Sequence, residues 1–132
     1  MTPTETRDAQ NIPFVGRWHY SRAELIADGI VHAVGIVLAI AAGSAMLTLA
    51  AFHAAPGEYV AAVFYVVALL TVLSVSLAYN LWPTTSPTKW VLRRFDHSAI
   101  YLLIAATYTP FLTQVSDSPL ASWMITVVWA AA

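Results

Sequence analysis

The stretch that decides the fold is Ile30–Phe52, which reads IVHAVGIVLAIAAGSAMLTLAAF and contains no Asp, Glu, Lys or Arg. An α-helix rises 1.5 Å per residue, so about 20 consecutive apolar residues cross the ~30 Å hydrocarbon core of a bilayer. A secretory signal peptide has a shorter apolar run, of about 7–15 residues. The length of this run therefore predicts a retained helix that crosses a membrane.

The composition of the whole chain supports the same interpretation. Of its 132 residues, 59% are hydrophobic and 10% are charged, whereas soluble domains carry about 25% charged residues. The formal net charge is −1, so nothing points to nucleic acid as a partner, and membrane lipids are the expected partners. Cysteine is absent, which excludes disulfide bonds and thiolate metal ligands.

Proline and glycine divide the chain into a polar tail and several apolar segments. Residues 1–20 predict a polar N-terminal tail, and residues 21–132 predict one bundle. Pro56-Gly57 and the segment Pro83–Lys89 mark loops, because proline and glycine interrupt helices. The remaining segments predict helices over about 22–52, 58–81 and 94–115, and a partial helix over 120–132.

The last apolar segment, 120–132, is too short to cross a bilayer. It is either a re-entrant or interfacial piece or the start of a longer helix, and its end within Val-Val-Trp-Ala-Ala-Ala favours a truncated chain. The predicted fold class is all-α. It is a multi-pass transmembrane helix bundle with three full spans and a partial fourth.

The basic residues predict how the bundle is oriented. They all lie before the first predicted helix or between the second and the third: Arg7, Arg17, Arg22, Lys89, Arg93 and Arg94. The loops expected at Pro56 and Asp117 contain none. Because cytoplasmic loops are enriched in Lys and Arg, we expect the N-terminus and the second loop in the cytoplasm. The expected location is the inner membrane of the cell.

Several ionisable or polar side chains lie within or beside the predicted spans, where such groups are costly and indicate a functional site. Glu24, Asp28 and His32 are spaced four residues apart, so they share one helix face. Two further pairs are expected in the same half of the membrane: Ser76 with Asn80, and Asp96 with His97. Carboxylates and imidazoles at one depth are the groups that form a metal site or an acid–base site.

The first-helix groups also have a structural interpretation. Ser21 followed by Glu24 fits a capping box, in which the glutamate accepts a hydrogen bond from a free backbone amide. Asp28 and His32 could be a packing pair that is satisfied between helices. Gly35 continues their face and would let a neighbouring helix approach closely. Spacing alone leaves both the functional and the structural interpretation open.

The stretch Arg94–Phe111, RFDHSAIYLLIAATYTPF, resembles the signature of the hemolysin III proteins. These are bacterial members of the progestin and adipoQ receptor family, related to the adiponectin receptors and the alkaline ceramidases. Ser76-Leu-Ala-Tyr-Asn80 resembles the family's Ser-x-x-Tyr-His pattern at the end of helix two. The first-helix pattern is similar as well: Glu24, Asp28, His32 and Gly35. The resemblance covers about residues 20–130.

The resemblance implies seven transmembrane helices and a zinc ion held by one His of helix two and an His-x-x-x-His pair of helix seven. It implies metal-dependent hydrolysis of lipid amides, with Ser76 and Asp96 as catalytic-site residues that help to hold water. Asn80 stands at the helix-two ligand position, and an amide is a poorer zinc ligand than imidazole. The sequence has no His-x-x-x-His pair, and His32 and His97 offer other nitrogens without a matched zinc role.

Zinc is therefore expected for the family but not for this chain alone, and the resemblance leaves open whether the chain is an enzyme. One function is a hemolysin III-like membrane protein with an incomplete, hydrolase-derived polar site on the cytoplasmic side. The others are a zinc-dependent lipid amide hydrolase at full length, and a membrane-perturbing cytolysin or receptor-like protein without catalysis. Polar groups left unpaired in an incomplete bundle predict one of three outcomes: water entry at the cytoplasmic half, a homo-oligomer or poor stability.

Overall fold

A computed structural model describes residues 21–83, 86–115 and 118–132, and these residues form four α-helices joined by short connections. The helices are α1 (Arg22–His53), α2 (Pro56–Leu81), α3 (Pro87–Gln114) and α4 (Pro119–Ala131). No strand occurs in these ranges, which confirms the all-α class. The predicted tail, 1–20, lies outside the described residues.

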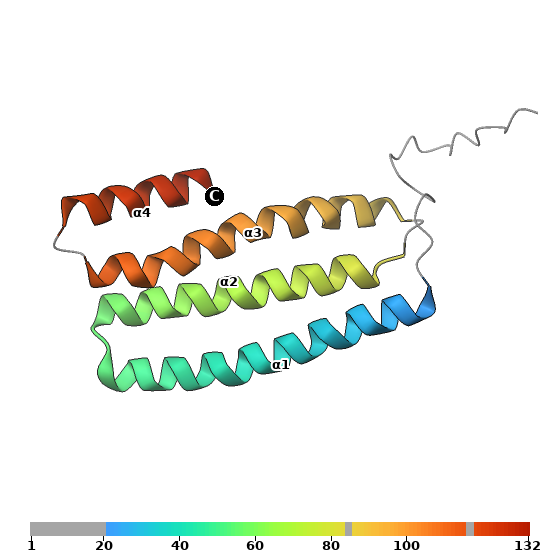
Figure 1. Cartoon of the computed structure of the whole chain (residues 1–132), viewed down its shortest axis with the longest axis horizontal. Helices are drawn as coiled ribbons and strands as arrows, with labels where there is room; N and C mark the ends of the chain where they lie inside the picture. The colour runs from blue at the N-terminus through green and yellow to red at the C-terminus, as the bar shows by residue number, and fades with distance from the viewer. Residues whose placement is uncertain (1–20, 84–85, 116–117) are drawn as a thin grey trace, which may run out of the picture.

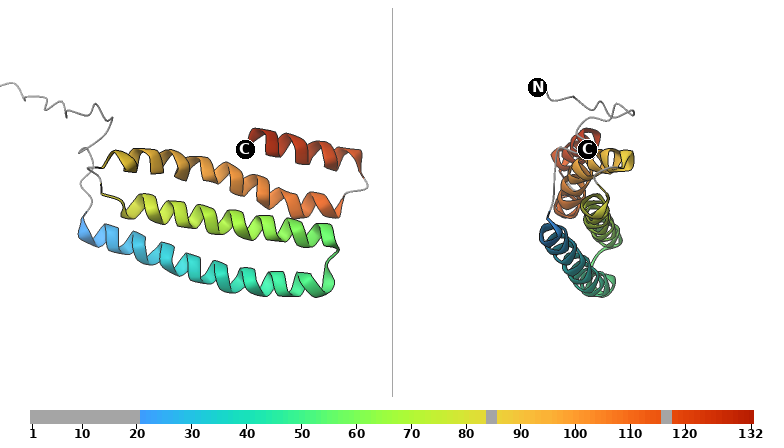
Figure 2. Two further views of the ribbon diagram at one scale, coloured as in Figure 1. Left: turned by 180° about the vertical axis from the view of Figure 1, so that it is seen from behind. Right: turned by 90° about the vertical axis from the view of Figure 1, so that its right-hand side faces the viewer.

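The helices form a single curved row in chain order (Figures 1 and 2). α1 packs against α2, α2 against α3, and α3 against α4, whereas α1 and α3 do not pack against each other. Consecutive helices run in opposite directions (Figure 1). The start of α1, the end of α2 and the start of α3 therefore lie at the same end of the row.

Side-chain caps explain where two of the helices begin. Ser21 and Glu24 form the predicted capping box: the Glu24 amide donates to Ser21 Oγ at 3.2 Å, and the Ser21 amide donates to Glu24 Oε2 at 2.7 Å. α3 begins at Pro87, about two turns before the predicted start near residue 94. Ser86 caps this helix, and the fixed φ of proline suits the first helical position.

The helices pack through small residues. The side chains buried between them are mostly alanines, such as Ala61, Ala105 and Ala106, which allow helix backbones to approach closely in a membrane. Among the glycines of α1, Gly43 makes the tightest contact with α2, because an added Cβ there would lie 2.9 Å from Val66 Cγ1. Gly35, where the sequence suggested a close approach, leaves an ordinary 3.7 Å to the Leu73 side chain.

Large apolar side chains cover the outside of α1 and α2. Both helices are long and apolar enough to cross a membrane. Only 11% of the most apolar 18-residue segment of α1 is buried, and 17% of that of α2. The core helix of a soluble protein would be mostly buried, so this exposure favours a lipid environment. α3 is not among the helices that are long and apolar enough to cross a membrane, and α4 is apolar but shorter. The number of spans therefore stays a prediction.

The packing at Gly43 can be tested by adding bulk there. We expect Gly43→Leu to lower the free energy of unfolding in detergent by about 1–3 kcal/mol, because the new side chain overpacks against the stiff Val66. The matched control is Gly57→Leu, since nothing lies within 4 Å of a Cβ at Gly57. Adding Val66→Ala to Gly43→Leu should restore part of the loss. Equal losses at both glycines would contradict this packing.

Candidate functional site

The polar residues selected from the sequence gather at one end of the row, which we call the polar end. It comprises the first three turns of α1, the last two turns of α2 and the first three turns of α3 (Figure 1). Every Lys and Arg that the structure describes lies there: Arg22, Lys89, Arg93 and Arg94. The same end holds the predicted site residues: Glu24, Asp28, His32, Ser76, Asn80, Asp96 and His97.

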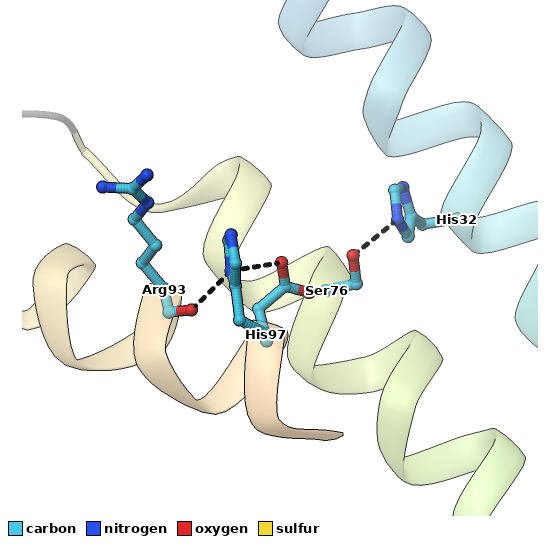
Figure 3. A network of polar contacts seen from close by, with 5 residues as sticks. His32, Ser76, Arg93 and His97 are labelled. Atoms are coloured by element: carbon cyan, nitrogen blue, oxygen red, sulfur yellow. Dashed lines mark hydrogen bonds and ion pairs between the residues drawn. The ribbon is translucent and has the colours of Figure 1, made fainter. Parts of the chain in front are cut away.

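One side-chain hydrogen bond joins α1 and α2 within the polar end. His32 Nε2 lies 3.0 Å from Ser76 Oγ (Figure 3). His32 Nδ1 lies 2.8 Å from the backbone carbonyl oxygen of Asp28. Both contacts are partly buried. The imidazole is thus held at both of its nitrogens, by its own helix and by the neighbouring one.

These two contacts determine the proton arrangement of the neutral imidazole. A carbonyl oxygen only accepts, so Nδ1 carries the proton and donates to Asp28. Nε2 then has a free lone pair and accepts the hydroxyl hydrogen of Ser76. This arrangement directs the Ser76 hydroxyl hydrogen toward His32 and leaves the oxygen lone pairs of Ser76 available to other donors.

The Asp28–His32 pair suggested by the spacing exists, but the contact uses the Asp28 backbone. The Asp28 carboxylate has no hydrogen bond or ion pair within the described ranges. His32 instead crosses to Ser76, which is 44 residues away in the chain. Helix periodicity could place His32 on a face, but it could not identify a partner on another helix.

Asp96 and His97 form a second, separate group on α3. His97 Nδ1 donates to the Arg93 carbonyl oxygen at 2.9 Å (Figure 3). Its distance to Asp96 Oδ2 is 3.7 Å, which is too long for a hydrogen bond. The His97 side chain is 63% exposed and that of Asp96 is 18% exposed. His97 Nε2 therefore remains an open acceptor when the ring is neutral.

Asn80 lies next to a lysine whose contacts the sequence did not predict. Lys89 Nζ donates to the Trp82 carbonyl oxygen at 2.9 Å, makes a longer 3.5 Å contact with the Asn80 carbonyl, and lies over the Tyr79 ring. A cation at the C-terminus of a helix satisfies free carbonyls and complements the helix dipole. The sequence feature that could have predicted these contacts is a basic residue shortly after the end of the predicted second helix.

The described side chains do not fit a catalytic zinc site, which normally has three protein ligands. No group of three His, Cys, Asp or Glu side chains in ranges 21–83, 86–115 and 118–132 could hold a metal ion. His32 Nε2 already accepts from Ser76, and Asn80 offers only an amide. The geometry of this chain positions the Ser76 hydroxyl and leaves His97 Nε2 as an acceptor without a partner in the described ranges. No metal-dependent step follows from this geometry.

A row of helices with apolar outer faces and one polar end is the architecture of a helical membrane protein. The sequence profile described as "Haemolysin-III related" matches residues 22–132. The chain belongs to the hemolysin III family.

Two curated relatives show the extent of the similarity. The chain is 38% identical over 110 residues to the "Hemolysin-3 homolog" of Bacillus subtilis (strain 168), which covers 83% of this chain and 51% of that protein. It is 37% identical over 111 residues to the "Hemolysin-3" of Bacillus cereus, which covers 83% of this chain and 49% of that protein. The chain thus spans about half the length of these relatives. No solved structure matches it significantly.

The hydrogen bond between His32 and Ser76 predicts a specific loss of stability. We expect Ser76→Ala to lower the free energy of unfolding in detergent by roughly 0.6–2 kcal/mol, because an interhelical hydrogen bond is lost and Nε2 becomes unpaired. Ser74→Ala, two residues away and exposed, is the matched control. Nitrogen NMR of the His32 ring should report protonated Nδ1 in the native chain. A native ring protonated at Nε2, or equal effects at the two serines, would contradict the assignment.

Proposed function

We propose that this chain is a hemolysin III-type membrane protein whose polar end derives from the site of a metal-dependent hydrolase. The observation that carries the proposal is the hydrogen bond between His32 and Ser76, which positions a hydroxyl between α1 and α2 at the polar end. Intramembrane groups of this kind are costly and mark functional sites. The family membership supports the same interpretation, because the resemblance of Ser76-Leu-Ala-Tyr-Asn80 to the family's Ser-x-x-Tyr-His pattern implies that Ser76 matches the family's serine.

In this proposal, Ser76 and Asp96 are the residues that hold water or substrate at the polar end. The Ser76 oxygen keeps its lone pairs for such a contact, because its hydrogen is directed to His32. Asn80 occupies the ligand position of helix two without supplying an imidazole. The site within this chain is then incomplete, and the chain alone binds no stoichiometric zinc.

The proposed location is the inner membrane of the cell, with the polar end on the cytoplasmic side. This orientation is supported by the described basic residues, which all lie at the polar end, whereas the opposite end has Glu58 and His53. Lys and Arg are retained on the cytoplasmic side during insertion. The surrounding lipids are the proposed partners of the apolar faces of α1 and α2.

The proposal is tested by metal content and lipid hydrolysis. The purified 132-residue chain should contain less than about 0.1 zinc per molecule, because it lacks three ligands. If the reading frame continues past Ala132 into a helix with an His-x-x-x-His pair, the longer protein should bind zinc and hydrolyse a lipid amide such as ceramide. In that protein, Ser76→Ala and Asp96→Asn should each lower the rate by about 10–100-fold, whereas Ser74→Ala should have little effect.

Two outcomes would contradict the proposal. Stoichiometric zinc in the 132-residue chain would show that its own residues complete a site. Absence of both zinc and hydrolysis from the longer protein, together with dye release from liposomes, would favour the membrane-perturbing function that the name of the Bacillus cereus relative suggests.

A further inference from the structure

His32 and Ser76 have the mutual geometry of a general base and a nucleophile. Of the described histidines, His32 is the one whose ring nitrogen lies within hydrogen-bond distance of a hydroxyl, 3.0 Å from Ser76 Oγ (Figure 3). Serine hydrolases activate their serine with an imidazole at about 2.6–3.2 Å, and a third group orients that imidazole. Here the Asp28 carbonyl takes the third role, since it accepts from Nδ1 at 2.8 Å and leaves Nε2 as the base.

A simpler explanation is that His32 only satisfies the Ser76 hydroxyl between the helices. A helical hydroxyl does not need a second helix for this purpose, because it can donate to a carbonyl one turn back on its own helix. Thr71, also on α2, donates to the Val67 carbonyl in this way. The Ser76 hydroxyl instead donates to Nε2 of His32. The contact between α1 and α2 therefore directs the serine hydrogen to a base.

Asn80 adds a hydrogen-bond donor on the same face of α2. It follows Ser76 by four residues, so it lies one turn nearer the polar end. Its side-chain amide makes no hydrogen bond within the described ranges, since the contact with Lys89 uses the Asn80 backbone carbonyl. An asparagine amide can stabilise the oxyanion that forms when a hydroxyl attacks a carbonyl group. The residue that weakens a zinc site here therefore suits acyl transfer.

The depth of Ser76 favours an ester group of a membrane lipid as the substrate. Ser76 lies five residues before the end of α2, so it is about 8 Å below that end. With the polar end at the membrane surface, this is the level of the boundary between headgroups and acyl chains, about 5–10 Å deep, where the ester carbonyls of phospholipids lie. This depth rests on the proposed orientation, whereas the geometry of Ser76 and His32 does not.

We propose that Ser76 and His32 form a nucleophilic dyad that transfers the acyl group of a lipid ester to water without a metal ion. Ser76 Oγ bonds to the ester carbonyl carbon while its proton moves to His32 Nε2. His32 gives this proton to the departing alcohol oxygen as the ester C–O bond breaks, which leaves the acyl group on Ser76. A water molecule then attacks the acyl carbon and gives one proton to Nε2. The carboxylic acid leaves as that proton returns to Ser76 Oγ.

The dyad is tested with a fluorophosphonate, which bonds covalently to an activated serine and releases fluoride. The purified 132-residue chain is reconstituted in phosphatidylcholine liposomes, treated with EDTA and labelled, and the modified residue is located by peptide mass spectrometry. We expect the label on Ser76. Labelling should be at least about 100-fold slower at Ser44, Ser74 and Ser98, because a positioned general base contributes about 10²–10⁴-fold. These exposed serines are internal controls in the same folded molecule.

Variants test the partners of Ser76 and the substrate class. His32→Gln removes the base and should slow the labelling of Ser76 by about 100-fold. The matched control is His53→Gln, in the last turn of α1, which should leave the rate unchanged. Asn80→Ala should also slow it by about 100-fold. In the same liposomes, the native chain should release fatty acid from a fluorogenic phosphatidylcholine, and Ser76→Ala should abolish this release.

Any of four results would overturn the proposal. They are absent or equal labelling of Ser76 and Ser74, an unchanged rate in His32→Gln, no release of fatty acid by the native chain, and labelling that EDTA abolishes. The last result would assign Ser76 to a metal-dependent site instead. The proposed function depends on zinc binding and amide hydrolysis by the longer protein, so its failure would leave the labelling of Ser76 unchanged.

Discussion

The structure depends on one constraint: a polar group inside a bilayer must find its partner within the protein, because hydrocarbon supplies none. Helical backbones satisfy this requirement along α1 and α2. Two of their threonine hydroxyls do so as well, since Thr48 donates to the Ser44 carbonyl and Thr71 to the Val67 carbonyl one turn back. Apolar surface gives no driving force between helices in lipid, so packing relies on small residues such as Gly43 and Ala61.

The same constraint separates the two kinds of polar residue in this chain. At the polar end, His32 and Ser76 satisfy each other across two helices, and Lys89 satisfies carbonyls at the end of α2. On the exposed face of α3, the hydroxyls of Tyr101 and Tyr108 make no hydrogen bond within the described ranges. The first group indicates a site that this chain itself organises, whereas the second lies on a face of α3 that the described helices leave exposed.

Most of the fold could be predicted from local sequence features. Charge-free runs longer than 20 residues, the Ser21–Glu24 capping box and the proline positions determined the helices and their order. The signature beginning at Arg94 identified the family before any geometry was known. The predicted start of the third helix, near residue 94, is too late because Pro83 and Pro87 indicate a loop, although proline is also favoured at the first position of a helix.

The partners of the site residues could not be predicted, because they depend on how the helices are rotated against each other. Periodicity brought Asp28 and His32 together, but the hydrogen bond from His32 to Ser76 depends on the registration of α1 against α2. The tight contact at Gly43 instead of Gly35 has the same origin, since it is set by which side chain of α2 lies opposite each glycine. Contacts of this kind between helices depend on tertiary packing, so the sequence pattern of one helix does not predict them.

The central claim is that these helices cross a bilayer with the polar end on the cytoplasmic side. It is tested most directly by labelling single cysteines in intact cells with a membrane-impermeant maleimide, since the chain has no cysteine of its own. Gly57 lies at the start of α2 and Thr88 at the start of α3, so the two cysteines are placed at opposite ends of the row of helices. The account predicts that Gly57→Cys is labelled from outside and that Thr88→Cys is labelled only after permeabilisation. Labelling of both positions from the same side, or the reverse pattern, would contradict it.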